Sequence, residues 1–294
     1  RLRDPEAQLA VVTDNPEYFE GLYDYTIPID LNYGSGVTQK LHLDLYTPFE
    51  ETLFIDSDCL LYGELTPLWE FFATDDGFGV RTWGPHTSGG TCQGIDDLDA
   101  YLRYFKLERI QNLKGGFYYF NSSEKAKAIF GKSRNIYKMR DEIGLTPFKN
   151  AAVADEAVIG TAMQICGVEA IRISSLKGTP VNTFLGKKEQ VDLNVLEGIA
   201  SFVKNGTFVQ PQAIHFGLGT QDSYAYLRDI HRLEASGMMT EQYAQVLAGV
   251  EATKREIKKK RSNMVRRVDE IGWIGILPGR ILKRFGRLPE DLNP

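Results

Sequence analysis

The stretch Thr52-Leu-Phe-Ile-Asp-Ser-Asp-Cys-Leu-Leu-Tyr62 decides the predicted fold. Its apolar run, residues 53–55, has the length and composition of a buried strand. The strand ends on Asp56 and Asp58, and where a strand gives way to a loop both side chains can turn toward one point. Two carboxylates there suit a divalent cation that is also held by phosphate oxygens. Asp-x-Asp also occurs by chance, so the prediction of a cation site depends on the apolar residues that flank the two acids.

The composition is typical of a globular chain with a sizeable core, with 43% hydrophobic and 25% charged residues among 294. No run is long and apolar enough to cross a membrane, and the first residues lack a signal-peptide pattern. Three widely spaced cysteines (Cys59, Cys92 and Cys166) match neither a disulfide framework nor a zinc cluster. We therefore expect a reducing, cytoplasmic setting.

The charge is distributed unevenly along the chain. Residues 254–287 contain twelve Lys or Arg against three acids, although the whole chain has a net charge of -5. Apolar residues from Trp273 to Phe285 are interleaved with this positive charge. The pattern suits a peripheral contact with anionic lipids or a dimer contact, and we do not expect nucleic acid as a partner. A solvated helix face is the plainer interpretation.

Strand-like and helix-like runs alternate through most of the chain. After Gly115-Gly116, the aromatic run 117–121 predicts a strand. Helices are predicted over 98–105, over 124–130 with Gly131 ending it, and over 152–166. The alternation predicts an α/β chain with a mostly parallel sheet, covered by helices. From Asp222 onward the pattern is helical, so we expect a domain over 1–221 and a basic, helical extension over 222–294.

Several chemically distinctive segments follow one another in a specific order. Lys40 comes first, then the Asp56-Ser57-Asp58 strand, the Gly115-to-Phe120 strand, Asp155-Glu156, and finally Ala-Ile-His215-Phe-Gly. Over roughly residues 8–221 this order resembles glycosyltransferases of the GT-A fold, most closely the glycogenin-like and galactosyltransferase-like group, glycosyltransferase family 8. The resemblance implies a Rossmann-like mixed, mostly parallel sheet flanked by helices, with the helical C-terminal extension beyond it.

The resemblance also implies roles for the polar residues. Lys40 would reach the donor sugar phosphate, and the segment from Asp56 through Ser57 to Asp58 would bind manganese and the donor ribose. His215 would complete the metal ligands. Taken without the resemblance, His215 is better interpreted as a core histidine at a strand end, and the match to the motif order reverses that preference.

Two further segments are matched to the sugar. Gly115 and Gly116 open the strand that would line the donor sugar pocket, and Asp155 and Glu156 would face sugar and acceptor. An acidic pair at the start of a helix also simply favours the helix dipole. Arg81 and His86, in or beside a Gly-rich loop, are weaker candidates for contacting donor or acceptor.

The chain departs from the family pattern in three places. The family's first strand, with its base-binding turn, has no counterpart before residue 9. Lys114 stands where the family has Asn or Asp. The family's diphosphate-gripping lysine is missing after His215, where residues 217–221 read Gly-Leu-Gly-Thr-Gln. The sequence offers three lysines in its place, Lys177, Lys187 and Lys188.

These features predict a metal-dependent transferase that moves a sugar from a nucleotide-sugar donor, a UDP-sugar, to a glycan or lipid-linked acceptor. Breaking a sugar–phosphate bond builds charge on the leaving diphosphate, and a divalent cation stabilises that charge. Two aspartates and a neutral histidine fit Mn²⁺ (or Mg²⁺) better than Ca²⁺. If the family resemblance holds, the anomeric configuration is retained.

Two alternatives remain open from the sequence. An apolar strand ending in Asp-x-Asp also occurs in phosphatases of the haloacid-dehalogenase type, in which Asp56 would be the nucleophile. The altered segments also fit a non-catalytic, glycosyltransferase-like scaffold that acts through its basic tail.

Overall fold

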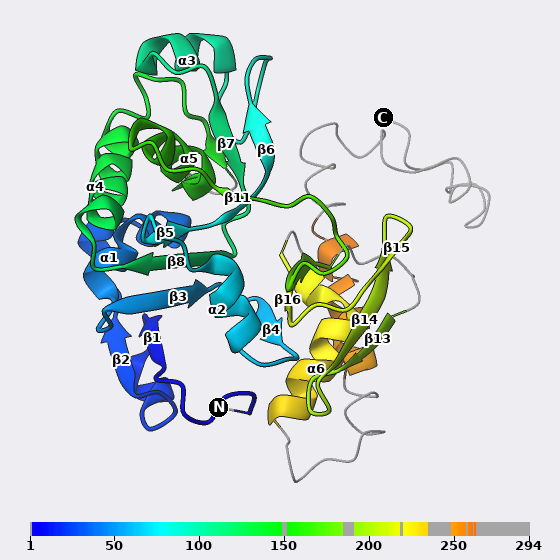
Figure 1. Ribbon diagram of the computed structural model, residues 1–294. Coiled ribbons are helices and arrows are strands. Elements are labelled where there is room, and N and C mark those ends of the chain that lie inside the picture. Colours follow the sequence, from blue (N-terminus) through cyan, green and yellow to red (C-terminus); the bar gives the residue numbers. More distant parts are fainter. Residues whose placement is uncertain are drawn as a thin grey trace, which may run out of the picture. The chain divides into compact units, whose positions relative to one another are not determined.

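The computed structural model describes residues 2–148, 152–184, 191–217, 220–234, 248–256, 258–260 and 262 (Figure 1). The chain divides into two compact units, Arg1–Gly217 and Leu218–Pro294. This division lies close to the expected boundary after residue 221. The assignment of separate roles to the two parts remains a prediction.

An aromatic strand forms the middle of the sheet that carries the Asp-x-Asp segment. Strand β8 (Phe117–Asn121) pairs antiparallel with β3 (Glu51–Ile55) and with β5 (Phe78–Gly79). Its four aromatic residues, 117–120, are buried, which is the environment that β-prone aromatic side chains favour. The register sets Ile55 opposite Phe117, so the two acids after β3 emerge beside the Gly-Gly pair before β8.

A second sheet lies directly after the two acids in the chain. Strand β16 (Ala213–His215) is its middle strand, antiparallel to β4 (Cys59–Leu61) and parallel to β12 (Val181–Thr183). One row across this sheet is Thr183, His215 and Cys59. The predicted metal-ligating histidine therefore lies on the strand beside the one that follows Asp58.

The other strands of the first unit form small sheets. Strands β11 (Ile171–Arg172), β6 (Arg81–His86) and β7 (Ile110–Leu113) form one sheet, and β13 (Val191–Asn194), β14 (Ile199–Lys204) and β15 (Thr207–Val209) form a meander. Two pairs complete the set: β1 (Ala10–Thr13) with β2 (Tyr25–Pro28), and β9 (Pro147–Phe148) with β10 (Ala152–Val153).

The mixed α/β class is as predicted, but the expectation of a mostly parallel sheet is wrong. In the part of the chain that the structure describes, three strand pairings are parallel and seven are antiparallel. Parallel neighbours need long crossovers, whereas β13, β14 and β15 follow one another through short turns. The turn between β14 and β15 is Asn205-Gly206, and both residues have positive φ, 51° and 76°. That is the conformation of a two-residue hairpin.

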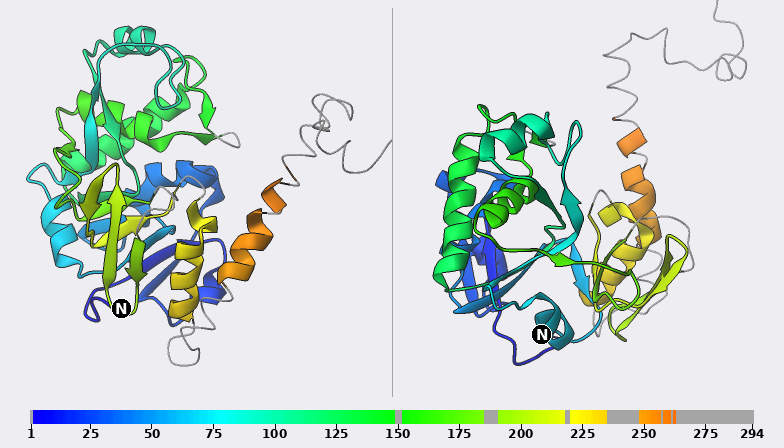
Figure 2. Two further views of the ribbon diagram at one scale, coloured as in Figure 1. Left: turned by 90° about the vertical axis from the view of Figure 1, so that its right-hand side faces the viewer. Right: turned by 45° about the horizontal axis from the view of Figure 1, so that its top comes forward.

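Helices cover the strands that position the site. In the first unit they are α1 (Leu43–Tyr46), α2 (Thr66–Phe72), α3 (Leu98–Phe105), α4 (Glu124–Lys138) and α5 (Asp155–Ile165), with 3-10 turns η1 (Pro16–Phe19), η2 (Leu31–Tyr33) and η3 (Gly36–His42). Helix α4 runs past Gly131, which was expected to end it. Helices α4 and α5 lie side by side, and α5 packs on β7 (Figure 2).

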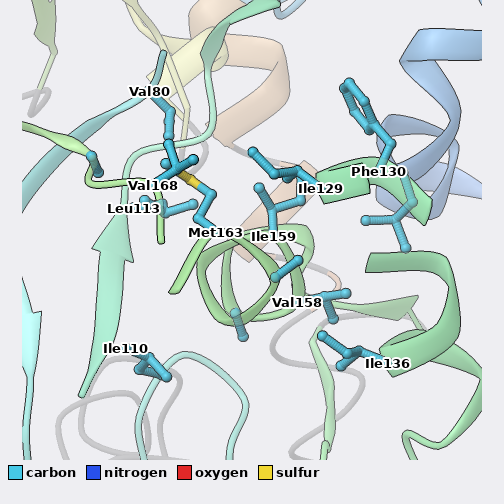
Figure 3. Packing of buried hydrophobic residues seen from close by; sticks show 14 of the residues in the cluster. Val80, Ile110, Leu113, Ile129, Phe130, Ile136, Val158, Ile159, Met163 and Val168 are labelled. Carbon is cyan, nitrogen blue, oxygen red and sulfur yellow. The ribbon is translucent and has the colours of Figure 1, made fainter. Parts of the chain in front are cut away.

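The largest hydrophobic cluster is centred on α5. Val158, Ile159 and Met163 of this helix are fully buried against side chains of β7 and α4 (Figure 3). A Cβ on Gly160 would lie 2.7 Å from the carbonyl oxygen of Gln111 in β7, so this close approach requires a glycine. The start of α5, with its two acids, is therefore held firmly against the sheet.

The second unit is helical where the structure describes it. It contains a 3-10 turn η4 (Thr220–Asp222), α6 (Tyr224–Glu234) and helical residues 248–256 and 258–260. The predicted interfacial segment from Trp273 to Phe285 lies outside the described residues. No described helix is both long and apolar enough to cross a membrane.

Candidate active site

An ion pair joins the first predicted acid to the predicted lysine. Asp56 follows β3, and its backbone N–H donates to the Gly116 carbonyl at 3.0 Å. Lys40 projects from η3, and its Nζ donates to Asp56 Oδ2 at 2.7 Å and lies 3.4 Å from the Gly115 carbonyl oxygen. Both side chains are largely buried, at 16% and 19% exposure. Two segments that are sixteen residues apart in sequence thus meet at one charge pair.

The acidic start of α5 lies at the same point. Lys40 Nζ is 3.8 Å from Asp155 Oδ2, which also accepts a hydrogen bond from the Tyr118 hydroxyl at 2.9 Å. Glu156 Oε1 accepts from the Gly115 N–H at 3.3 Å. Tyr118 itself is fully buried. The two acids are therefore fixed by groups from η3 and β8, in addition to the favourable dipole at their helix start.

The electrostatics of this cluster leave it short of positive charge. Burial alone would lower the pKa of Lys40, but Asp155 and Asp56 outweigh it and raise that pKa above its ordinary value. Burial raises the pKa of Asp56 despite Lys40. Burial and then Asp155 raise the pKa of Glu156. Lys40 and, toward Glu156, Lys114 face the carboxylates of Asp56, Asp58, Asp155 and Glu156, and this excess of negative charge favours a further cation.

The second predicted acid meets the predicted histidine. His215 Nε2 lies 3.0 Å from Asp58 Oδ1 and 3.9 Å from Asp56 Oδ2. The Phe216 N–H donates to the Asp58 carbonyl at 2.9 Å, which fixes β16 against the turn that holds Asp58. Ligands on one octahedral ion at about 2.1 Å are about 3 Å apart. The spacing of the Asp58 and His215 donor atoms fits a shared ion.

Cys59 adjoins these ligands without matching their chemistry. Asp58, Cys59 and His215 offer donor atoms that lie within 4.8 Å of one another. Burial, with Asp56 and Asp58, raises the pKa of the Cys59 thiol, so the thiolate that metals require is disfavoured. Asp56 is not part of that compact group, and its Oδ2 lies 2.7 Å from Lys40 Nζ. Asp58 and His215 are thus the better-placed pair, with Asp56 adjacent.

The glycines beside the site leave room for its side chains. A Cβ on Gly115 would lie 2.4 Å from the Tyr118 hydroxyl and 3.1 Å from Asp155 Oδ2. On Gly116 it would lie 2.7 Å from His215 Nδ1. The Gly-Gly pair before the aromatic strand is therefore a packing requirement of the site.

The remaining candidates lie at varied positions. Ser57 is exposed in the turn between the acids, His86 is half-buried in β6, and Lys177 is exposed. Lys187 and Lys188 lie outside the described residues. Arg81 is buried at the first position of β6.

The sequence interpretation missed two buried polar residues near the site, Tyr118 and Lys204. Tyr118 was hidden among the aromatic residues of its strand. Lys204 takes a core-facing position in an alternating strand, and that alternation was the signal that could have identified it.

No protein-family model matches the chain, and neither does any curated protein. The chain is similar to the crystal structure of the galactosyltransferase LgtC in complex with donor and acceptor sugar analogs, at 12% identity and a TM-score of 0.44. The match covers 84% of this chain and 87% of that chain. A likeness this distant supports no functional conclusion. The functional argument therefore rests on the geometry of the site.

Proposed function

We propose that the chain is a metal-dependent glycosyltransferase that moves a sugar from a nucleotide-sugar donor, a UDP-sugar, to a hydroxyl acceptor on a glycan or lipid-linked saccharide. One observation carries the proposal. Lys40, Asp56, Asp58, Asp155 and His215, from four separate segments of the sequence, form a chain of contacts no longer than 3.9 Å. This is the set that the sequence order singled out.

The metal would be held by Asp58 and His215, with Asp56 adjacent. Carboxylate oxygens alone suit Mg²⁺ or Ca²⁺, and the imidazole shifts the preference toward Mn²⁺. When bound, such an ion acts as a Lewis acid toward the diphosphate that leaves the sugar. Ser57, exposed between the two acids, would lie on the donor side of this turn.

Lys40 provides a fixed positive charge beside the reacting groups. It holds the Asp56 carboxylate and remains protonated across the physiological range, because its pKa is raised. A preorganised cation stabilises negative charge that develops on a leaving group without having to reorient during the reaction. We therefore assign Lys40 to the donor phosphate.

Asp155 and Glu156 would face the sugar. The sugar ring gains positive character as the bond to phosphate breaks, and buried carboxylates nearby stabilise it. Gly115 and Gly116, which lack side chains, line the space between these acids and His215. Retention of the anomeric configuration is part of the proposal through the family resemblance.

The test begins with a thermal-shift panel of nucleotide sugars, with and without Mn²⁺, followed by donor hydrolysis. The substitution Asp58→Asn preserves shape and removes one ligand charge. We expect it to lower Mn²⁺-dependent hydrolysis by about 100-fold or more. Asp192→Asn, on an exposed position of β13, is the matched control and should behave as wild type.

Unchanged hydrolysis and manganese dependence in Asp58→Asn would contradict the proposal. A trapped phosphoryl group on Asp56 would instead support a phosphatase. A chain that binds no nucleotide sugar, with or without Mn²⁺, would support the scaffold alternative.

A further inference from the structure

Lys204 occupies a position where the strand pattern calls for an apolar side chain. In β14, Ala200, Phe202 and Lys204 are buried, while Ser201 and Val203 between them are more open. Period-two alternation therefore places Lys204 on the core face of the strand. Its exposure is 7%. Because this face of the strand is buried, Lys204 is not one of the solvated lysines that are common on strand surfaces.

The ammonium of Lys204 ends on the strand next to the proposed metal ligand. Its Nζ donates to the carbonyl of Thr183 at 2.9 Å. Thr183 is the register partner of His215 across the parallel pair β12–β16. Adjacent strands are about 4.8 Å apart, so one strand separates the ammonium from the strand of His215.

A second buried cation is attached to the same strand. Arg81 is 3% exposed, and its Nη1 donates to the carbonyl of Val181 at 2.5 Å, two residues before Thr183. Its Nε is buried without a hydrogen-bond partner. The Lys114 N–H donates to the Arg81 carbonyl at 3.0 Å, directly before the Gly-Gly pair of the site.

The two buried cations have no acidic partner in the described part of the chain. No carboxylate there lies within ion-pair distance of Lys204 or Arg81. The charges that act on Lys204 come from Arg81 and Lys114 and are positive. After burial, these charges help to lower the pKa of Lys204 to about 8. Burial lowers the pKa of Arg81 to about 10.

Buried cations are normally paired, because an unpaired one loses its hydration without compensation. An ammonium has three N–H donors and a guanidinium has five. The carbonyls of Thr183 and Val181 satisfy one donor of each group. The remaining donors and the unbalanced charge fit an anion with several acceptor oxygens, and phosphate meets this requirement.

We infer that Lys204, supported by Arg81, forms a phosphate-binding subsite beside the proposed metal ligands, and that it binds the diphosphate of the donor. The identification of the anion as the donor diphosphate rests on the proposed function. In this subsite Lys204 of β14 supplies a positive charge. Residues 217–221, shortly after His215, contain no lysine that could do so. The sequence offered three lysines for this role. Lys177 is the one of them that the structure describes, and its side chain is exposed.

The experiment measures binding of inorganic pyrophosphate to the full chain by calorimetry, with a chelator present so that metal is not involved. Lys204→Met removes the charge with little change in side-chain volume. Lys132→Met, at an exposed position of α4, is the control. We expect the control to bind as wild type and Lys204→Met to bind at least about tenfold more weakly. Lys204→Arg should restore much of the affinity.

A folding readout separates lost binding from lost structure. The thermal midpoint of Lys204→Met should equal or exceed that of wild type, because an uncompensated buried charge has been removed. Pyrophosphate affinity that is the same in wild type and Lys204→Met would overturn the inference. So would a wild-type chain that binds no pyrophosphate.

The two proposals can fail separately. Lys204-dependent binding of pyrophosphate, without Mn²⁺-dependent hydrolysis of any nucleotide sugar, would support the anion subsite and contradict the proposed function. Hydrolysis of a nucleotide sugar with equal UDP and pyrophosphate affinity in Lys204→Met would support the function and overturn the subsite.

Discussion

Lys40 and Lys204 are both buried lysines close to the proposed metal ligands, yet their surroundings are opposite. Lys40 faces Asp56 and Asp155, and its pKa is raised above the ordinary value because these acids outweigh the effect of burial. Burial, together with the positive charges of Arg81 and Lys114, lowers the pKa of Lys204 to about 8. The first lysine has its counter-charges within the protein. The second has none in the described chain, which is why we infer that a ligand supplies its counter-charge.

Removing Lys40 should have the largest effect on stability. Lys40→Met leaves Asp56 and Asp155 buried without their cation, and breaking a buried pair in this way costs about 3 kcal/mol or more. We expect the free energy of unfolding in urea to fall by that order at pH 7. Saturating Mn²⁺ should restore part of the loss, since the ion supplies positive charge to the same acids.

The control for this experiment is Lys132→Met, which removes an exposed lysine. If Lys40→Met were as stable as this control, the acids would not depend on the lysine, and the contrast between the two buried lysines would fail.

Removing Lys204 should change stability in the opposite direction. Its pKa falls from 10.5 to about 8 on folding, so the folded state binds this proton less readily than the unfolded state does. The resulting penalty is fully present below pH 8 and disappears as the pH rises toward 10.5. Lys204→Met should therefore stabilise the protein by up to about 3 kcal/mol at pH 7.

The pH dependence gives this prediction a second readout. The stability difference between Lys204→Met and wild type should shrink when urea unfolding is repeated at pH values between 8 and 10.5. A variant that is less stable than wild type at every pH would show that Lys204 is a structural residue with a partner.

A smaller change leaves both lysines in place and moves only the histidine. In Gly116→Ala the new Cβ would lie 2.7 Å from His215 Nδ1. We expect the free energy of unfolding to fall by about 1–3 kcal/mol and Mn²⁺-dependent donor hydrolysis to fall by about tenfold or more. The measurements are thermal unfolding and initial rates.

Gly131→Ala is the matched control, because a Cβ there meets no atom within 4 Å inside α4. The free energy of unfolding of this variant should rise by up to about 1 kcal/mol, because alanine has a higher helix propensity than glycine. Equal behaviour of the two alanine variants would remove the argument that Gly116 makes room for His215.

Local patterns predicted several elements of the fold. Helix α3 and strand β8 have the bounds that the sequence indicated, because an amphipathic run and an aromatic run leave few alternatives. The order of Lys40, Asp56, Asp58, Asp155 and His215 also proved to be a spatial cluster. Their roles in binding and catalysis remain predictions.

Features that depend on tertiary packing were not predictable in this way. The meander β13–β15 was missed, although Asn205-Gly206 is a strong hairpin signal. Gly131 was expected to end a helix, yet it lies within α4, where packing of that helix outweighs the cost of one glycine. The alternation of β14 marks Lys204 as core-facing, but its hydrogen bond to the Thr183 carbonyl of β12 depends on tertiary packing.

The backbone around the two acids is cross-linked to neighbouring strands. The Asp56 N–H donates to Gly116, the Cys59 N–H donates to Asp56, and the Phe216 N–H donates to Asp58. The first and third of these bonds join segments that are distant in sequence, and the second closes the turn between the two acids, so these protons should exchange with deuterium only when this local structure opens. A bound ion would therefore have little loop entropy to overcome here, and ligands should alter exchange mainly elsewhere in the chain.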